Sequence, residues 1–332
     1  MPVQAMSSFV LNESNEIPND MFTRKFFAAC VDDRARLSTT WSGSVEARYQ
    51  ACSALSELAY QNEKICMAII NAPGMLDAIR SVANGRHVGA RNAAISALNC
   101  MSRSIEAAQA LIHARIVEEV LTPILSEKGR GEKYEARVAR AVLAIANIMG
   151  AKGGYEICAP VLAKYPNHLE MAVNILGHSL NGLKWGGILF ALYSVIIPMS
   201  HLSAIKENQA RLVELGMIEK LARVLREWQP GHLSDSVMER VLLIILSIND
   251  QPEFQHRIRL SGLIAGLQQI QLGLRNEPPQ CRALAEQLLS SLLECHVAVC
   301  MGQHARLGAD SPLMLLDDFV SSLILDMAFP MN

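Results

Sequence analysis

The amino-acid sequence predicts an all-α solenoid of about five to six degenerate helical repeats, closed by capping helices. A segment rich in small and apolar residues recurs along the 332-residue chain, and no strand-like alternation persists anywhere. Such repeats cannot bury their apolar faces alone, so they must stack. Apolar residues make up 51% of the chain and aromatic residues only 5%, which suits stacked helices with aliphatic cores.

Two sets of positions recur in phase along the chain. The first set starts from the Asn of an Ile-Ala-Asn-Ile stretch and repeats at about 40–47 residues, with one longer step in the fourth repeat. We call its members the ladder positions: Glu57, Cys100, Asn147, Ser194, Ser247 and Ser291. The second set places a residue before each new apolar run: Gly74, Arg115, Gly216 and Gly262. Glycine at three of these four places predicts short turns between helices.

Three regions follow one another along the chain. Residues 1–40 look irregular and are expected to form an N-terminal arm or a partial capping repeat. Residues 41–300 carry the repeat array, divided by Gly and Pro turn signals. Residues 301–332 hold a linker and an acidic amphipathic helix that starts after Asp310. We expect this helix either to cap the open end of the array or to dock in the protein's own groove or on a partner.

Charge and cysteine usage narrow the class of protein. The formal net charge is −2, which argues against a nucleic-acid binder that relies on phosphate contacts. The eight cysteines are scattered and indicate no disulfide framework. We expect no secretory signal at the N-terminus, and the most apolar stretch, an expected helix at 186–199, is shorter than the roughly 20 residues of a membrane span. We therefore expect a cytoplasmic protein, with the nucleus as the alternative.

The recurring residues resemble those of the armadillo-repeat superfamily over roughly residues 45–295. The resemblance implies a right-handed array whose repeats have three helices, the third lining a concave groove. It says little about function, because the superfamily serves adhesion, nuclear import, chaperoning and signalling. Nuclear-import adaptors carry ladders of Trp and Asn on the third helix. Only Asn147 keeps the ladder Asn here and no Trp stands four residues before a ladder position, so binding of a basic import signal is not expected.

Residues four and seven apart share one face of a helix, so the groove can be followed in columns. Leu143, Phe190 and Leu243 stand four residues before ladder positions, and Arg140 and Arg240 stand seven before. These columns predict an apolar groove with a charged rim, which suits an amphipathic helix or an apolar peptide. A shifted register is the alternative and would place these side chains in the core. The predicted partner-binding residues are Arg140, Leu143, Asn147, Phe190, Ser194, Arg240, Leu243 and Ser247.

No pattern in the chain indicates catalysis, and neither an enzyme nor a bound cofactor is expected. A phosphate-binding Gly-Lys-Ser/Thr loop is absent. Zinc-like residue types cluster at Cys295, His296, Cys300 and His304. The first two are adjacent and point in different directions on a helix, so core cysteines are expected rather than a metal site. The basic segment 128–140 has glutamates among its basic residues, which is typical of a solvated helix face.

The first functional hypothesis is a non-catalytic scaffold or adaptor that binds a peptide or helix of a partner protein in the concave groove. Two alternatives stay open. One is a regulator of a nucleotide-binding partner, such as an exchange factor or co-chaperone. The other is a structural subunit of a large assembly, to which the high apolar content would fit.

Overall fold

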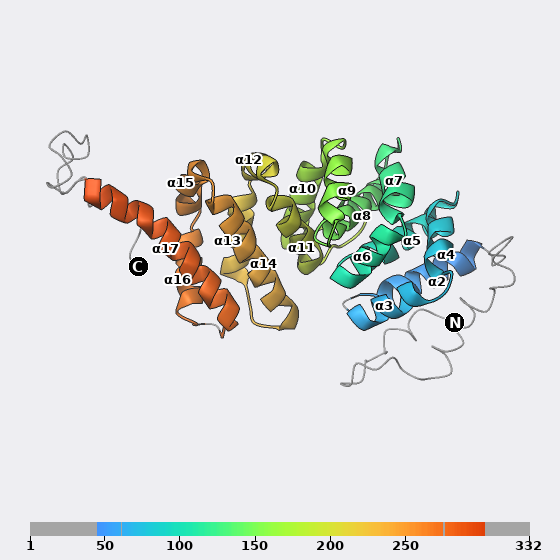
Figure 1. Cartoon of the computed structure of the whole chain (residues 1–332), viewed down its shortest axis with the longest axis horizontal. Coiled ribbons are helices and arrows are strands. Elements are labelled where there is room, and N and C mark those ends of the chain that lie inside the picture. Colours follow the sequence, from blue (N-terminus) through green and yellow to red (C-terminus); the bar gives the residue numbers. More distant parts are fainter. Residues whose placement is uncertain (1–44, 61, 275, 303–332) are drawn as a thin grey trace. The chain divides into compact units, whose positions relative to one another are not determined.

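A computed structural model describes residues 45–302 except 61 and 275, and in this part of the chain the regular structure is helical (Figure 1). The described chain divides between Lys164 and Tyr165 into two compact units. The predicted arm at 1–40 and the predicted C-terminal helix after Asp310 lie outside the described residues.

Unit 1 contains short helices that alternate with longer ones. In chain order they are α2 (Val45–Leu58), α3 (Glu63–Asn71), α4 (Met75–Ala83), α5 (Val88–Met101), α6 (Ile105–His113), the π-helical turn η2 (Val117–Leu121), α7 (Thr122–Ser126), α8 (Glu132–Ile148) and α9 (Gly154–Ala163).

Unit 2 continues the same alternation. Its helices are α10 (His168–Leu180), α11 (Leu192–Ser203), α12 (Lys206–Glu214), α13 (Met217–Glu227), α14 (His232–Asn249), α15 (Pro252–Leu260), α16 (Leu263–Gln271) and α17 (Pro279–Gly302).

The helices follow a three-helix order in which a third helix closes each repeat. In unit 1 the repeats are α3–α4–α5 and α6–η2/α7–α8, preceded by α2. In unit 2 they are α12–α13–α14 and α15–α16–α17, preceded by α10 and α11. Neighbouring third helices pack together, α2 with α5 and α5 with α8 in unit 1, and α11 with α14 and α14 with α17 in unit 2. The all-α repeat prediction is confirmed; the right-handedness of the array stays a prediction.

The junction between first and second helices explains the glycine set. Gly74, Gly216 and Gly262 adopt φ values of 76°, 79° and 79° and immediately precede α4, α13 and α16. A left-handed residue reverses the chain within one position, and glycine adopts it without the steric cost of a Cβ. Arg115 stands at the same junction with φ 56°, although it has a Cβ. The second recurring set therefore marks one structural position, at which Arg115 is the strained member.

Side-chain hydrogen bonds join neighbouring third helices within each unit. Each of these bonds involves at least one serine. In unit 1, Ser56 pairs with Ser96 at 2.8 Å, and Asn147 Nδ2 donates to Ser102 Oγ at 3.1 Å. In unit 2, Ser247 Oγ donates to the Ser203 carbonyl at 2.9 Å, and Asn249 Nδ2 donates to Ser291 Oγ at 2.9 Å. Because they lie at apolar helix contacts, these bonds fix which residues of adjacent repeats face each other.

Candidate functional site

The ladder positions identify the end of the third helix in most repeats. Glu57, Cys100, Asn147 and Ser247 all lie in the last turn of their helices. Ser194, in contrast, lies in the first turn of α11. The hydrogen bond from Ser247 to Ser203 shows that the last turn of α11 is the neighbour of the ladder position on α14. The predicted register is therefore wrong on α11, where His201 takes the ladder position.

A turn at Gly186 and Gly187 causes this shift. Trp185 and Ile188 exchange two backbone hydrogen bonds of 2.8 and 3.0 Å around the two glycines, which have φ values of 56° and 78°. Positive φ at both central residues is typical of a tight two-residue hairpin turn and is incompatible with a helix. The expected helix at 186–199 therefore begins only at Leu192, and the extra residues lie before α11 rather than in the following repeat.

Four predicted groove residues are buried. Leu143 on α8 is fully buried, and Asn147 is only 3% exposed because its amide bonds to Ser102. Phe190 lies before α11 and is 6% exposed, while Ser194 bonds to the Ala191 carbonyl at 2.6 Å. These four side chains pack in the interior. The prediction that they line an exposed groove is therefore wrong, and the alternative, a shifted register with these residues in the core, is correct for them.

The other four predicted residues are half-buried. Arg140 donates from Nη1 to the Asn92 carbonyl at 3.5 Å, and burial lowers the pKa of its guanidinium below the usual value. Ser247 accepts a hydrogen bond of 3.0 Å from Gln209 Nε2 in addition to its bond to Ser203. Arg240 and Leu243 stand on the same face of α14 as Ser247.

Once the register is corrected, unit 2 presents one continuous set of half-buried residues on two neighbouring third helices. We call it the third-helix stripe: Ile197 and His201 on α11, and Arg240, Leu243 and Ser247 on α14. Ile197 and His201 were not among the residues predicted for the groove. The adjacent glycines Gly186 and Gly187 were the signal that could have found them, since a helix seldom runs through such a pair. The stripe combines aliphatic side chains with one guanidinium.

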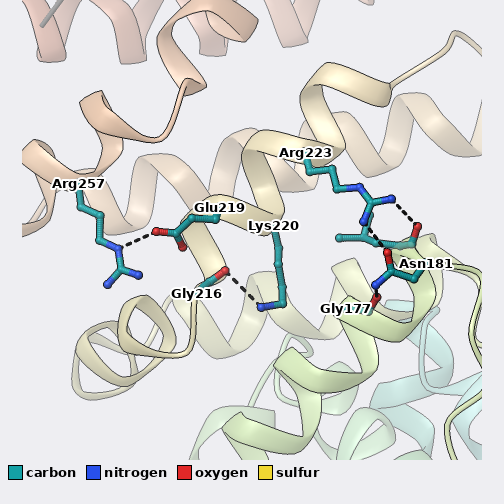
Figure 2. Close-up of a pocket in the computed structure, with 8 residues that line it drawn as sticks. Gly177, Asn181, Gly216, Glu219, Lys220, Arg223 and Arg257 are labelled. Carbon is teal, nitrogen blue, oxygen red and sulfur yellow. Dashed lines mark hydrogen bonds and ion pairs between the residues drawn. The ribbon is translucent and has the colours of Figure 1, made fainter. Parts of the chain in front are cut away.

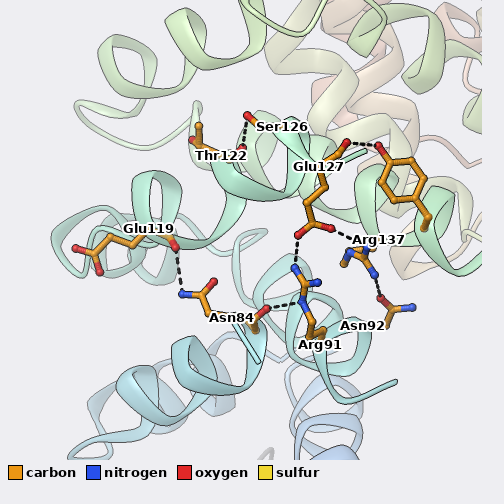
Figure 3. Close-up of polar contacts among 10 residues, drawn as sticks. Asn84, Arg91, Asn92, Glu119, Thr122, Ser126, Glu127 and Arg137 are labelled. Carbon is orange, nitrogen blue, oxygen red and sulfur yellow. Dashed lines mark hydrogen bonds and ion pairs between the residues drawn. The ribbon is translucent and has the colours of Figure 1, made fainter. Parts of the chain in front are cut away.

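Most charged residues of segment 128–140 are exposed, as expected of a solvated face, but Arg137 departs from it and belongs to a polar cluster in unit 1 (Figure 3). Arg137 is only 6% exposed and donates from Nη2 to Glu127 at 2.8 Å and from Nη1 to Asn92 at 3.2 Å. Glu127 also pairs with Arg91, and its carbonyl accepts a bond from the Tyr134 hydroxyl at 2.8 Å. These contacts join α5, α7 and α8, so the cluster has a structural role.

A second polar site, which we call the basic pocket, is lined by residues on or next to α10, α13 and α15 of unit 2 (Figure 2). Its volume is about 430 Å³. Its lining residues are Gly177, Leu180, Asn181, Gly216, Glu219, Lys220, Arg223 and Arg257. Three cationic side chains thus face one carboxylate. Burial tends to raise the pKa of Glu219, but the hydrogen bond from Arg257 and the charges of Arg257 and Lys220 outweigh it and lower that pKa overall.

Neither a metal site nor a straight membrane span is found among the described residues. No group of three His, Cys, Asp or Glu side chains in this part could hold a metal ion. The side chains of Cys295, His296, Cys300 and His304 lie outside the described part of the chain. No single described helix is long and apolar enough to cross a membrane; the pair α3 and α4, bent by 91°, reaches the length and composition together.

Three-helix repeats joined through their third helices define the armadillo-like repeat class. No protein-family model and no curated protein matches the chain. Among solved structures, the designed armadillo repeat protein YIII(Dq)4CqI is 17% identical with a TM-score of 0.48, covering 81% of this chain and 98% of that one. A designed armadillo repeat protein in complex with the peptide (KR)4 is 16% identical with a TM-score of 0.47 and the same coverages. The helices described above show an all-α repeat fold.

Proposed function

We propose that this chain is a non-catalytic protein-binding scaffold that holds a peptide or helix of a partner protein on its third helices. The third-helix stripe of unit 2 carries this proposal, because Ile197 and Leu243 present aliphatic surface from adjacent helices. An amphipathic helix can bury its apolar face on such a surface. Arg240 lies beside Leu243 and would orient the partner through a carboxylate.

The composition of the stripe argues for a different ligand from the basic peptide bound by one designed armadillo protein. The stripe contains a guanidinium and no carboxylate, so a basic peptide would be repelled. An acidic or neutral amphipathic segment suits the stripe better. We also place the protein in the cytoplasm or nucleus, as expected from its scattered cysteines; imaging of a tagged full-length chain tests this location.

A site-specific photo-cross-linker tests the binding surface in the source cells. A benzophenone amino acid at Leu243 or Ile197 should yield a covalent adduct with one partner protein. Leu272, which is 70% exposed and lies after α16, serves as the matched control and should give no adduct with that protein. Adducts of equal yield from all three positions, or none from the stripe, would overturn the proposal.

The identity of the cross-linked partner distinguishes three roles for the scaffold: a regulator, a structural subunit and an adaptor. A nucleotide-binding partner whose nucleotide release is accelerated by the purified chain would indicate a regulator. A fixed set of subunits in constant ratio would indicate a structural component of an assembly. A partner that exchanges, with its nucleotide kinetics unchanged, would indicate an adaptor. In each case Leu243→Asp should reduce partner binding while the circular dichroism of the helices stays unchanged.

A further inference from the structure

The basic pocket differs from the third-helix stripe in the residues that line it and in the helices that carry them. Its residues come from α10, α13 and α15, and the proposed scaffold function does not use it. Pockets of about 300–1,000 Å³ hold side chains and small ligands, and this pocket lies in that range at about 430 Å³. Arg257 pairs with Glu219 and Arg223 with Glu227, so three cationic groups against two carboxylates leave one positive charge, which predicts an anionic occupant.

The ammonium group of Lys220 donates its hydrogen bonds to neutral backbone carbonyls, whereas each of the two arginines of the pocket has a carboxylate partner. Its Nζ donates to the Leu215 carbonyl at 3.2 Å and to the Gly216 carbonyl at 3.5 Å, between α12 and α13. Figure 2 shows the bond to Gly216. Among the described residues no carboxylate lies within ion-pair distance of this ammonium. A carboxylate that entered the pocket would therefore give Lys220 a charged partner in place of weak contacts.

The two arginines differ from Lys220 in their pairing. Arg257 donates from Nε to Glu219 at 2.8 Å. Arg223 donates from Nε to Glu227 at 2.8 Å and from Nη1 to the Asn181 side chain at 2.7 Å. Both arginines therefore already have a carboxylate partner, whereas Lys220 has only the carbonyl contacts described above.

Two glycines keep the space around the ammonium open. A Cβ at Gly177 would lie 3.3 Å from Lys220 Cε, and a Cβ at Gly216 would lie 3.4 Å from Lys220 Nζ. A Cβ at Gly177 would be tight against the lysine, whereas a Cβ at Gly216 would only touch it, so the absence of both leaves the ammonium more room. Gly216 is also required by its left-handed φ of 79°, whereas Gly177 lies inside α10 and has no such backbone reason.

The sequence of this chain contains a segment with the complementary charge. Residues 303–332 hold four aspartates and one arginine, and Asp317 and Asp318 stand in a run of leucines and other apolar residues. Leu183, which is 53% exposed, follows the pocket residue Asn181 by two positions and offers apolar surface beside the pocket. An acidic, leucine-rich segment matches both features.

The chain is also long enough to reach the pocket. The helix α17, which ends at Gly302, and the pocket helix α13 both pack against α16 in unit 2. Residues 303–309 span about 23 Å when fully extended, at about 3.3 Å per residue, and residues 310–316 add about 10 Å as the first turns of the expected helix, at about 1.5 Å per residue. A compact unit of this size has a radius of gyration of about 14 Å. The length of the linking residues therefore does not prevent Asp317 from reaching α13.

We propose that the acidic C-terminal segment, residues 310–332, docks on the basic pocket of its own chain. One carboxylate of the Asp317–Asp318 pair binds Lys220 inside the pocket, and the neighbouring leucines contact Leu183. The contact is an ion pair held by charge and by burial of a small apolar surface, so salt weakens it. It is independent of the third-helix stripe and of any partner bound there.

Carbodiimide cross-linking of the full-length chain tests this contact directly. A water-soluble carbodiimide joins an amine and a carboxylate into an amide when the two are in contact, with loss of water that the carbodiimide takes up as a urea. Mass spectrometry of the digested monomer should find Lys220 joined to Asp317 or Asp318. Lys220→Arg keeps the positive charge but cannot form this amide, so the link should be lost. Lys64→Arg, at an exposed lysine of unit 1, should leave the link unchanged.

Two further arms decide whether the segment of the same chain is the occupant. Asp317→Asn/Asp318→Asn should remove the link, and high salt should reduce it. In an equal mixture of isotopically heavy and light protein, the linked peptides should be wholly heavy or wholly light. Mixed pairs would identify a second copy as the occupant and overturn the proposal. Absence of the Lys220 link, or equal linking of the segment to exposed lysines throughout the chain, would also overturn it.

Discussion

Arg137 donates a hydrogen bond of 2.8 Å to Glu127 although its side chain is only 8% exposed. The same carboxylate pairs with Arg91 on α5, so one acid compensates two guanidinium groups from neighbouring third helices (Figure 3). A buried charge that loses its partner cannot recover its hydration. The contact between α5, α7 and α8 therefore depends on Glu127.

Removal of this carboxylate should destabilise the protein strongly. We expect Glu127→Ala to lower the free energy of unfolding by about 2 kcal/mol, because Arg137 stays buried without its charged acceptor. The cost should stay below the roughly 3–5 kcal/mol of a fully buried pair, since water reaches part of Glu127. Urea denaturation measures the change in midpoint. Glu132→Ala, at an exposed site of α8, is the control; equal effects of the two substitutions would show that the pairing of Arg137 adds nothing.

The strained junction at Arg115 offers a stabilising substitution. Arg115→Gly should raise the free energy of unfolding by about 0.5–1 kcal/mol, because glycine adopts φ 56° without a Cβ clash. Loss of the exposed contact to Glu119 at 3.6 Å should offset only a small part. Thermal unfolding measures the gain. The reverse substitution, Gly262→Ala, meets no atom within 4 Å and should cost about 1 kcal/mol through its backbone alone.

Aspartate substitutions should separate core residues from stripe residues. Phe190→Asp buries a charge at a position that is 6% exposed, so we expect it to unfold the repeat that contains α11. Leu243→Asp leaves its charge partly in water and should keep the helical circular dichroism. Limited proteolysis of the two variants provides the comparison. A native digestion pattern for Phe190→Asp would contradict the assignment of this residue to the core.

A buried histidine should make stability depend on pH. Burial lowers the pKa of His168 below its ordinary value of 6.5, while a 2.7 Å hydrogen bond to the Tyr165 carbonyl partly opposes this. The unfolded chain therefore binds a proton near pH 6.5 that the folded chain does not bind. Stability should fall as the pH drops below about 6.5 and level off below the lowered pKa. Urea denaturation over a pH series should show a smaller fall for His168→Gln than for the native chain.

Two buried thiols should be unreactive in the folded protein. Burial, aided by the nearby Cys100 and Glu63, raises the pKa of Cys66 to about 12. Burial also raises the pKa of Cys158 to about 12, with a smaller contribution from Glu118. Thiolates react and thiols do not, so alkylation of both sites should be very slow until urea unfolds the chain. Site-resolved mass spectrometry checks this; rapid native labelling of either cysteine would show that its helix opens locally.

The repeat architecture could be predicted because the same kinds of residue recur at the same structural positions of successive repeats. Gly74, Gly216 and Gly262 mark one left-handed junction, and four ladder positions, Glu57, Cys100, Asn147 and Ser247, mark the last turn of a helix. The stripe was harder to predict because helical spacing defines faces without showing which face is covered. On α8, small residues allow close packing on all sides, so residues 141–149 are buried throughout and Leu143 with them.

The serine and asparagine bonds between third helices make each repeat specific for its neighbour. Asn147 needs Ser102 beside it, and Asn249 needs Ser291, whereas purely aliphatic contacts would accept many partners. Exchanging or duplicating repeats within the chain would leave such amides without acceptors. The repeats of this protein therefore share one order of helices but cannot be exchanged for one another. The fold depends on their order along the chain.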